Sequence, residues 1–252
     1  MKYFIITLFP NMIDSYVNES ILGRAKEKKL IDFKSFHLRE FTKDKHGRTD
    51  GKAYGGGPGM VLWVDPIINT FEKILKEIDK DKKGKNGSAK KNILIVNFVP
   101  SAKIFDNNLA KEYSKKYNYI IFICGRYEGV DARVNSVIKD ILANKKKELK
   151  EKGVTLTVKI ENISIGNFVL TGGELPALIM IDAISRQIKG VLHDNESIEE
   201  NRVASSEVYA RPEIYERKIG DKETIKVKKY KVPEILLSGH HAKIEEWRKN
   251  KK

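Results

Sequence analysis

The sequence predicts an α/β fold with a mostly parallel sheet, followed by a smaller, mainly helical C-terminal domain. Short apolar runs alternate along the chain with segments of helical period, as expected for strands that helices cover on both faces. Near residue 190 the composition changes, because a polar, acidic stretch precedes a Lys-rich C-terminal part. We therefore expect a first domain over residues 1–189, a linker over 190–203 and a second domain over 204–252.

Four segments are the predicted strands of the first domain. The first three are almost continuously apolar, which is typical of strands buried on both faces. The fourth precedes a glycine-rich segment. In chain order they are Tyr3–Phe9, Ile93–Val99, Tyr119–Cys124 and Val154–Ile163.

Helices are predicted between these strands. Asp65 and Pro66 give a capping residue and a first-turn proline for a helix that continues with one apolar stripe. Three further segments have the same periodicity, namely Met12–Lys28, Phe105–Tyr117 and Val130–Leu142.

Two charged segments look like insertions into this scaffold. Asp79–Lys91 is polar with Gly and Ser, which favours a flexible loop. Asn144–Gly153 is a charged extension, which we expect to project into solvent as a helix. In the C-terminal part, a short helix is predicted after Ser238, with Ile244 and Trp247 on it.

The charge balance narrows the class of partner. The chain has 252 residues and 48 Lys+Arg against 34 Asp+Glu, a formal charge of +14. An excess of this size favours a polyanion such as RNA, although a solvated Lys-rich surface is an alternative. Cys124 is the single cysteine, which excludes a disulfide framework and Cys-cluster metal sites. Because the chain has neither a membrane-length apolar run nor a signal peptide, we expect a cytoplasmic protein without membrane contact.

Three strands are followed by turn segments: VPSAK, CGRYEG and SIGNFVLTGGELPA. In open α/β sheets, ligands bind outside the carboxyl ends of the strands. Glycines there would form a pocket made largely of main chain, which suits the edge of an adenosine, although each is also compatible with an ordinary turn. The chain contains neither GxGxxG nor GxxxxGK[ST], so dinucleotide and nucleoside-triphosphate sites lose their main support.

Two further features have more than one interpretation. Tyr54–Met60 (YGGGPGM) follows a basic loop and is either a loop that faces nucleic acid or a close-packed turn. Glu174–Ile188 is apolar almost all round, so we expect a helix buried in the core or at a subunit interface. Arg186 near its end either meets an acid or ligand oxygen or caps the helix.

At these motifs the chain resembles a known family. HGRTDGKAYGGGPGM, CGRYEGVDARV, SIGNFVLTGGELPA, IDAISRQIKGVL, YARPEIYE and VPEILLSGHHAKIEEWR are similar to segments of the bacterial tRNA (guanine-N1)-methyltransferases of the TrmD type, which modify tRNA position 37. The resemblance implies a SPOUT-like fold with a deep trefoil knot. It also implies S-adenosylmethionine as methyl donor, tRNA as substrate and a homodimer with each active site between subunits. Whether Mg²⁺ assists stays open.

Carried over position by position, the resemblance assigns roles to particular residues. Glu128 matches the residue that recognises the target guanine, and Arg186 matches the arginine that steadies guanine O6. The Tyr54–Met60 loop and the C-terminal domain match parts that contact tRNA. The donor-binding positions are Pro100, Gly125, Tyr127, Ile165, Gly166, Asn167, Phe168, Val169, Leu170, Gly172 and Gly173.

The general base is the position at which this chain departs from the family. Guanine N1 must lose a proton before it attacks the methyl group, and the family uses an Asp in the linker. Asn201 stands at the aligned position, and an amide cannot accept that proton at neutral pH. We therefore expect Glu200 to supply the carboxylate, with Glu199 second, and Asn201 to position the base. The alternatives are a catalytically silent tRNA-binding protein and a knotted methyltransferase for another RNA.

Overall fold

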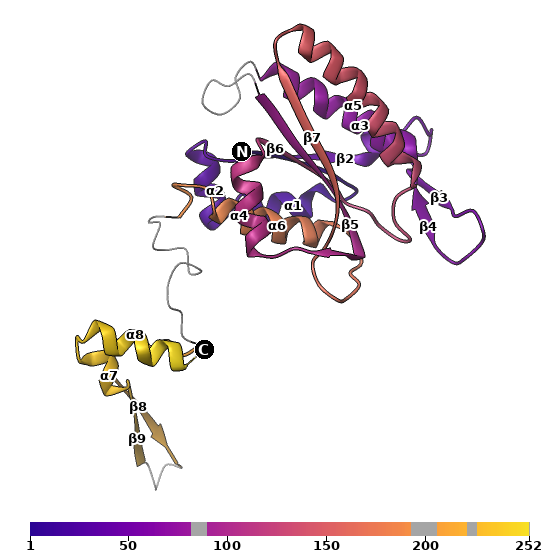
Figure 1. Ribbon diagram of the computed structural model, residues 1–252. Helices are drawn as coiled ribbons and strands as arrows, with labels where there is room; N and C mark the ends of the chain where they lie inside the picture. Colours follow the sequence, from indigo (N-terminus) through magenta and orange to yellow (C-terminus); the bar gives the residue numbers. More distant parts are fainter. Residues whose placement is uncertain (82–89, 193–205, 221–225, 252) are drawn as a thin grey trace. The chain divides into compact units, whose positions relative to one another are not determined.

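The computed structural model describes residues 1–81, 90–192, 206–220 and 226–251 (Figure 1). The chain separates into two compact units, Met1–His193 and Asp194–Lys252. Most of the linker that the sequence predicts over 190–203 lies outside the described residues.

The larger unit is built on a five-stranded sheet in the order β2-β1-β6-β5-β7, and every neighbouring pair is parallel. The prediction of an α/β fold with a mostly parallel sheet is confirmed. β6 is buried along its whole length and β1 at all but its first residue, because helices cover both faces of the sheet, as their apolar sequences require. The strands are β1 (Lys2–Thr7), β2 (Asp32–His37), β5 (Lys90–Ile104), β6 (Tyr119–Ile123) and β7 (Thr155–Ser164).

Helices form a layer on each face of the sheet, and each layer has its own apolar core (Figure 1). One layer contains α3 (Val64–Lys80) and α5 (Arg133–Glu151), beside the short 3₁₀ helix η1 (Leu38–Phe41). The other contains α1 (Pro10–Val17), α2 (Ser20–Glu27), α4 (Asn107–Lys116) and α6 (Glu174–Arg186).

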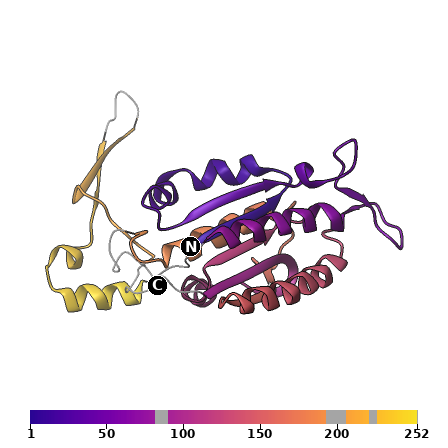
Figure 2. The same ribbon diagram turned by 90° about the horizontal axis from the view of Figure 1, so that it is seen from above.

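A small hairpin of β3 (Asp50–Lys52) and β4 (Met60–Leu62) projects beyond the sheet (Figure 2). Its connecting segment contains Gly55, Gly56 and Gly57, all with positive φ, a backbone conformation that glycine adopts without strain.

Two helix predictions need correction. Asp65 does not cap α3, because the N-cap is Trp63, which makes no side-chain capping bond, and Asp65 lies within the first turn. The segment predicted as one helix over Met12–Lys28 is two helices. The break falls at Asn18, whose side chain donates to the Asp14 carbonyl, and at Ser20, which has a φ of 52°.

The bounds of the two predicted insertions also change, because neighbouring helices and strands extend into both. The 144–153 extension does not project freely, since α5 continues to Glu151 and Leu149 is buried in the core. Lys145 ties the extension to α3 through an ion pair with Asp79. The sequence analysis missed this packing because Leu149 stands among charged residues. It lies seven residues after Leu142 and therefore on the same helical face. The segment 79–91 gives residues to α3 and β5 at its ends, and its centre, 82–89, lies outside the described residues.

The sequence analysis did not predict strand β2. β2 reads DFKSFH, in which only Phe33 and Phe36 are buried, because it is an edge strand. A short strand with two buried residues lacks the apolar run that marks the central strands.

A polar contact fixes the other edge of the sheet. Tyr113 on α4 donates its hydroxyl to Glu161 on β7, which also pairs with Lys159. Burial raises the pKa of Glu161, but these two partners outweigh it, and the net pKa lies below the ordinary value of 4.5. The Tyr113 hydroxyl stays protonated because burial and the Glu161 charge raise its pKa.

The smaller unit was predicted to be mainly helical, but its described residues form strands as well as helices. An antiparallel hairpin of β8 (Ile214–Ile219) and β9 (Lys226–Lys231) accompanies α7 (Glu234–Leu237) and α8 (His241–Asn250). The hairpin sequences IYERKI and KVKKYK are rich in charged residues and do not alternate polar and apolar residues, so they lack the period that predicts a half-buried strand. Helix α8 begins after Ser238 as predicted, and Trp247 on it packs against Tyr209.

Candidate functional site

A cavity of about 470 Å³ lies at the carboxyl ends of β5, β6 and β7. The irregular part of β5, where its register with β7 shifts after Phe98, forms one side, the loops after β6 and β7 form two others, and the first turn of α6 closes the cavity. Its volume lies within the usual range for pockets that bind small organic ligands. The lining residues fall in the segments 97–100, 123–132 and 162–173, with Asn135 on α5 and Pro176 on α6.

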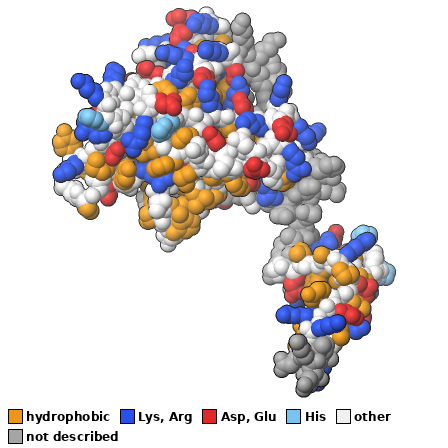
Figure 3. Space-filling view, turned by 180° about the vertical axis from the view of Figure 1, so that it is seen from behind, with side chains coloured by type: hydrophobic (Ala, Val, Ile, Leu, Met, Phe, Trp, Pro, Cys, Tyr) orange, Lys and Arg blue, Asp and Glu red, His pale blue; other side chains and the backbone are white. Residues whose placement is uncertain are grey.

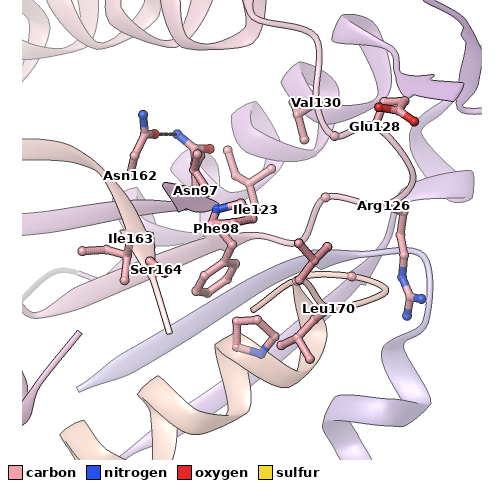
Figure 4. A pocket seen from close by; sticks show the side chains of 18 of the residues that line it. Asn97, Phe98, Ile123, Arg126, Glu128, Val130, Asn162, Ile163, Ser164 and Leu170 are labelled. Carbon is pink, nitrogen blue, oxygen red and sulfur yellow. Dashed lines mark hydrogen bonds between the residues drawn. The ribbon is translucent and has the colours of Figure 1, made fainter. Parts of the chain in front are cut away.

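Apolar side chains line one part of the cavity, and polar side chains line another. Figure 4 shows Phe98, Ile123 and Leu170 around the hollow, while Arg126 and Glu128 lie toward one end of it. The loops after β6 and β7 also contribute glycines, whose backbone amides and carbonyls are not covered by a side chain. A surface of this kind offers apolar contact and unshielded amides and carbonyls, which fits a flat heterocycle with an attached sugar.

The two glycines before α6 fasten its start to the loop after β6. Gly173 donates its amide to the Gly125 carbonyl at 2.9 Å, and Gly172 forms a β-bridge with Arg126. A Cβ on Gly173 would lie 2.7 Å from the Cys124 Cα, far inside normal contact. Only glycine fits there, so the two walls of the cavity can approach this closely.

The turn after β7 is held in a similar way. Ser164 donates its hydroxyl to the Gly166 carbonyl at 3.0 Å, and the Phe168 amide donates to the same carbonyl at 2.9 Å. Gly166 and Asn167 themselves lie in the turn and not among the lining residues. The other predicted donor positions all line the cavity: Pro100, Gly125, Tyr127, Ile165, Phe168, Val169, Leu170, Gly172 and Gly173.

A buried ion pair supports one wall of the cavity. Arg126 contacts Glu174 at 2.9 Å, and Glu174, only 1% exposed, also accepts a hydrogen bond from the Thr7 hydroxyl at 2.7 Å. The Arg126 guanidinium lies 4.5 Å from the Phe9 ring centre and also donates to the Thr171 carbonyl. The pair joins the end of β1, the loop after β6 and the start of α6. The sequence analysis did not single out this pair, although both residues lie inside the motifs it quoted.

The Cys124 thiol beside this pair is not a nucleophile. Burial and the Glu174 charge raise its pKa well above the ordinary value, so it stays protonated.

Glu128 lies at the rim of the cavity, where the β3–β4 hairpin meets the loop after β6. Its amide donates to the Met60 carbonyl at 3.0 Å, and the side chain is exposed. A Cβ on Gly59 would lie 2.1 Å from the Glu128 Cγ, so the glycine makes room for this carboxylate. Tyr54 is fully exposed, and the neighbouring glycines are exposed as well. The Tyr54–Met60 segment is therefore an exposed loop and not a close-packed turn.

Three asparagines form a polar group in the cavity wall that the sequence analysis missed. Asn97 donates to Asn135 at 3.0 Å and to Asn162 at 3.3 Å (Figure 4). The sequence did hold an indication of this group, because Asn97 is a polar residue inside the apolar run ILIVNFV. In the sheet, Asn97 is paired in register with Asn162 on β7. These amides offer donors and acceptors without charge.

The predicted catalytic residues do not all meet at this cavity. Arg186 is half-buried at the far end of α6, twelve residues after Glu174 (186 − 174), which is about 18 Å along a helix. It is not among the lining residues. Glu199, Glu200 and Asn201 lie outside the described residues.

The described segments bear on metal and membrane binding in two ways. No group of three or more His, Cys, Asp and Glu side chains there is placed to hold a metal ion. None of the helices in these segments is long and apolar enough to cross a membrane.

Comparisons with known proteins match the chain along its whole length. The profile of the family described as tRNA (Guanine-1)-methyltransferase TrmD matches residues 1–252. A tRNA (guanine-N(1)-)-methyltransferase of Lachnoclostridium phytofermentans is 37% identical over 99% of this chain and 86% of its own length. Proteins of the same name from Clostridioides difficile and Mycoplasma mycoides are 38% and 36% identical, over 99% and 98% of this chain and 91% and 85% of their own lengths.

Proposed function

Since this chain belongs to the tRNA (guanine-1)-methyltransferase family and methylates N1 of guanine in tRNA with S-adenosylmethionine as donor, we propose that the donor binds in the cavity at the ends of β5, β6 and β7. The observation that carries this proposal is the glycine-walled cavity of about 470 Å³ at the strand ends. Both family membership and the names of the relatives favour this activity over a silent tRNA-binding protein or a methyltransferase for another RNA.

The donor supplies an electrophilic methyl group on a sulfonium. Phe98, Ile163 and Leu170 give an apolar bed for its adenine, and the main chain of the 125–129 and 164–173 loops gives hydrogen-bond partners. The asparagine group at Asn97 provides further uncharged polar contacts for the ribose. The Arg126–Glu174 pair stands behind this wall and keeps the loops at fixed separation.

We propose that the target guanine, at tRNA position 37, enters from the rim beside Glu128. Its exposed carboxylate can accept hydrogen bonds from the N–H groups of guanine. The adjoining Tyr54–Met60 loop is exposed, so it can contact the RNA around the base. The base must leave its stack to reach the donor.

The proton on guanine N1 must leave before N1 can attack the methyl group. We assign this proton to Glu200 in the linker, with Glu199 as the second choice and Asn201 as a positioning amide. As the proton departs, negative charge develops on guanine O6, and a fixed cation there is stabilising. We assign that cation to Arg186.

The position of Arg186 supports a homodimer. Within one chain it lies about a helix length from the cavity, so a second copy would have to bring it to the site. Hydrophobic side chains gather on the lower part of the larger unit in Figure 3. On α1 and α6 the exposed hydrophobic residues include Met12, Tyr16, Leu175 and Ile179. An apolar face of this kind is typical of a subunit interface.

Three further features belong to this proposal. A trefoil knot would use the 164–173 loop, which lies against the loop after β6 before the chain enters α6. We assign tRNA contacts to the C-terminal domain predicted over residues 204–252, and a cytoplasmic location to the protein. Mg²⁺ has no assigned ligands in this proposal.

Methyl transfer onto defined tRNA transcripts tests the proposal. Transcripts with guanine at position 37 should accept labelled methyl groups, whereas the same transcripts with adenine there should not. Transfer at equal rates to both transcripts would contradict the assigned target. Transfer to neither would contradict the function.

A further inference from the structure

The β8–β9 hairpin has an unusual arrangement of side chains. All twelve strand residues are exposed. The antiparallel register places directly opposed residues on the same face, so the hairpin has two distinct faces. The first, here called the tyrosine face, consists of Tyr215, Arg217, Ile219, Lys226, Lys228 and Tyr230.

The tyrosine face combines aromatic rings with positively charged side chains. The Tyr215 and Tyr230 rings lie 6.2 Å apart and are 61% and 43% exposed. Lys228 lies 5.1 Å from the Tyr230 ring centre, and Arg217 is its directly opposed neighbour. No acidic residue of the two strands lies on this face. Glu216 lies on the opposite face, where it pairs with Lys229 at 2.7 Å.

An isolated two-stranded hairpin is marginally stable in water, so the directly opposed Tyr215 and Tyr230 rings help to hold its strands together, yet both residues keep exposed surface for a partner. Exposed rings flanked by Lys and Arg are the elements that bind unpaired nucleic acid, because bases stack on the rings and cations contact the phosphates. A base-paired RNA helix keeps its bases stacked on one another, so the partner should be unpaired.

We propose that the tyrosine face binds an unpaired segment of the substrate tRNA, with bases stacked on Tyr215 and Tyr230 and phosphates at Arg217 and Lys228. This inference rests on the tRNA methyltransferase function, and it narrows the tRNA contact assigned to the C-terminal domain to one face of this hairpin. The hairpin then anchors the tRNA and takes no part in the chemical step.

Equilibrium binding of the full-length protein to a substrate tRNA transcript tests the stacking. Tyr215→Leu and Tyr230→Leu keep a bulky apolar side chain but remove the ring, and each should weaken binding about tenfold. Tyr215→Phe and Tyr230→Phe keep the ring and should bind like the wild type. Wild-type affinity in both Leu variants, or an equal loss in the Phe variants, would overturn the proposal.

The charges have a matched control on the other face of the same hairpin. The double variant Arg217→Gln/Lys228→Gln should reduce the slope of log affinity against log salt by roughly 1.4, at about 0.7 per phosphate contact. The double variant Lys218→Gln/Lys231→Gln removes the same charge from the opposite face and should change the slope by less than half as much. Equal changes would mean that the tyrosine face is not the contact surface.

A measurement on the wild-type protein avoids any effect of the variants on hairpin folding. Photo-crosslinking to tRNA that carries 4-thiouridine should give adducts on peptides containing Tyr215 or Tyr230. Adducts elsewhere but none on these peptides would overturn the proposal. Donor affinity and the rate at saturating tRNA should be unchanged in all variants. If the wild-type protein methylates tRNA but the hairpin variants bind tRNA as tightly as it does, this inference alone is refuted. If the wild-type protein does not transfer methyl groups, the function is refuted.

Discussion

Replacing Gly173 with alanine should damage the donor site through the backbone. The new Cβ would lie 2.7 Å from the Cys124 Cα and 3.1 Å from the Gly125 nitrogen. Ordinary contact begins near 3.4 Å, so the first distance is short by 0.7 Å (3.4 − 2.7). Cys124 is buried at the end of β6 and cannot retreat.

The strain must therefore move the start of α6 away from the loop after β6. Overpacking of this kind costs about 1–3 kcal/mol of unfolding free energy. The hydrogen bond from Gly173 to Gly125 forms part of the cavity wall, and its displacement should weaken S-adenosylmethionine binding at least about tenfold.

Gly125→Ala is the matched control. Its Cβ would lie 3.4 Å from the Val130 Cγ2, an ordinary contact, so the free energy of unfolding should change by less than about 0.5 kcal/mol. Chemical denaturation gives the stability, and titration calorimetry gives the donor affinity. The reasoning fails if Gly173→Ala leaves both quantities unchanged, or if Gly125→Ala loses as much stability.

Three other changes test the site and the fold. Arg126→Gln leaves the Glu174 carboxylate buried without its cation, so it should lower the free energy of unfolding by about 3 kcal/mol in a denaturation experiment. A decrease under about 0.5 kcal/mol would show that the ion pair contributes little to stability. Glu161 has a lowered pKa in the folded protein, so its stabilising effect is present above pH 4.5 and declines as the pH falls through the folded pKa. The stability gap between wild type and Glu161→Gln should therefore be largest near neutral pH and shrink in acid, and a gap that grows in acid would reverse the assignment. Glu200→Gln should slow single-turnover methyl transfer ~10²-fold with donor and tRNA binding intact, and an unchanged rate would assign the base elsewhere.

The sequence predicted the parallel sheet because its central strands are buried on both faces and so are almost continuously apolar. It failed for β2, where an edge position leaves Phe33 and Phe36 as the only buried residues. It also failed for the end of α5, because a charged run surrounds the one buried leucine, Leu149.

For the site, glycines after the apolar strands indicated the right loops, and nine of the predicted donor positions line the cavity. Arg126 and Glu174 could not be paired from the sequence, because their contact depends on how closely the loop after β6 approaches the start of α6. The Asn97 group likewise depends on the register between β5 and β7. Local patterns locate turns, whereas tertiary approach decides which side chains meet.

The central claim is that this protein methylates guanine N1 at tRNA position 37. The most direct measurement is nucleoside mass spectrometry of a defined tRNA transcript after incubation with the protein and S-adenosylmethionine, with the modified nucleotide mapped by nuclease digestion. We predict one 1-methylguanosine per transcript, located at position 37, and none when that position carries adenine. Methylation at another nucleotide or another atom, or no methylation of a guanine-37 transcript, would contradict the claim.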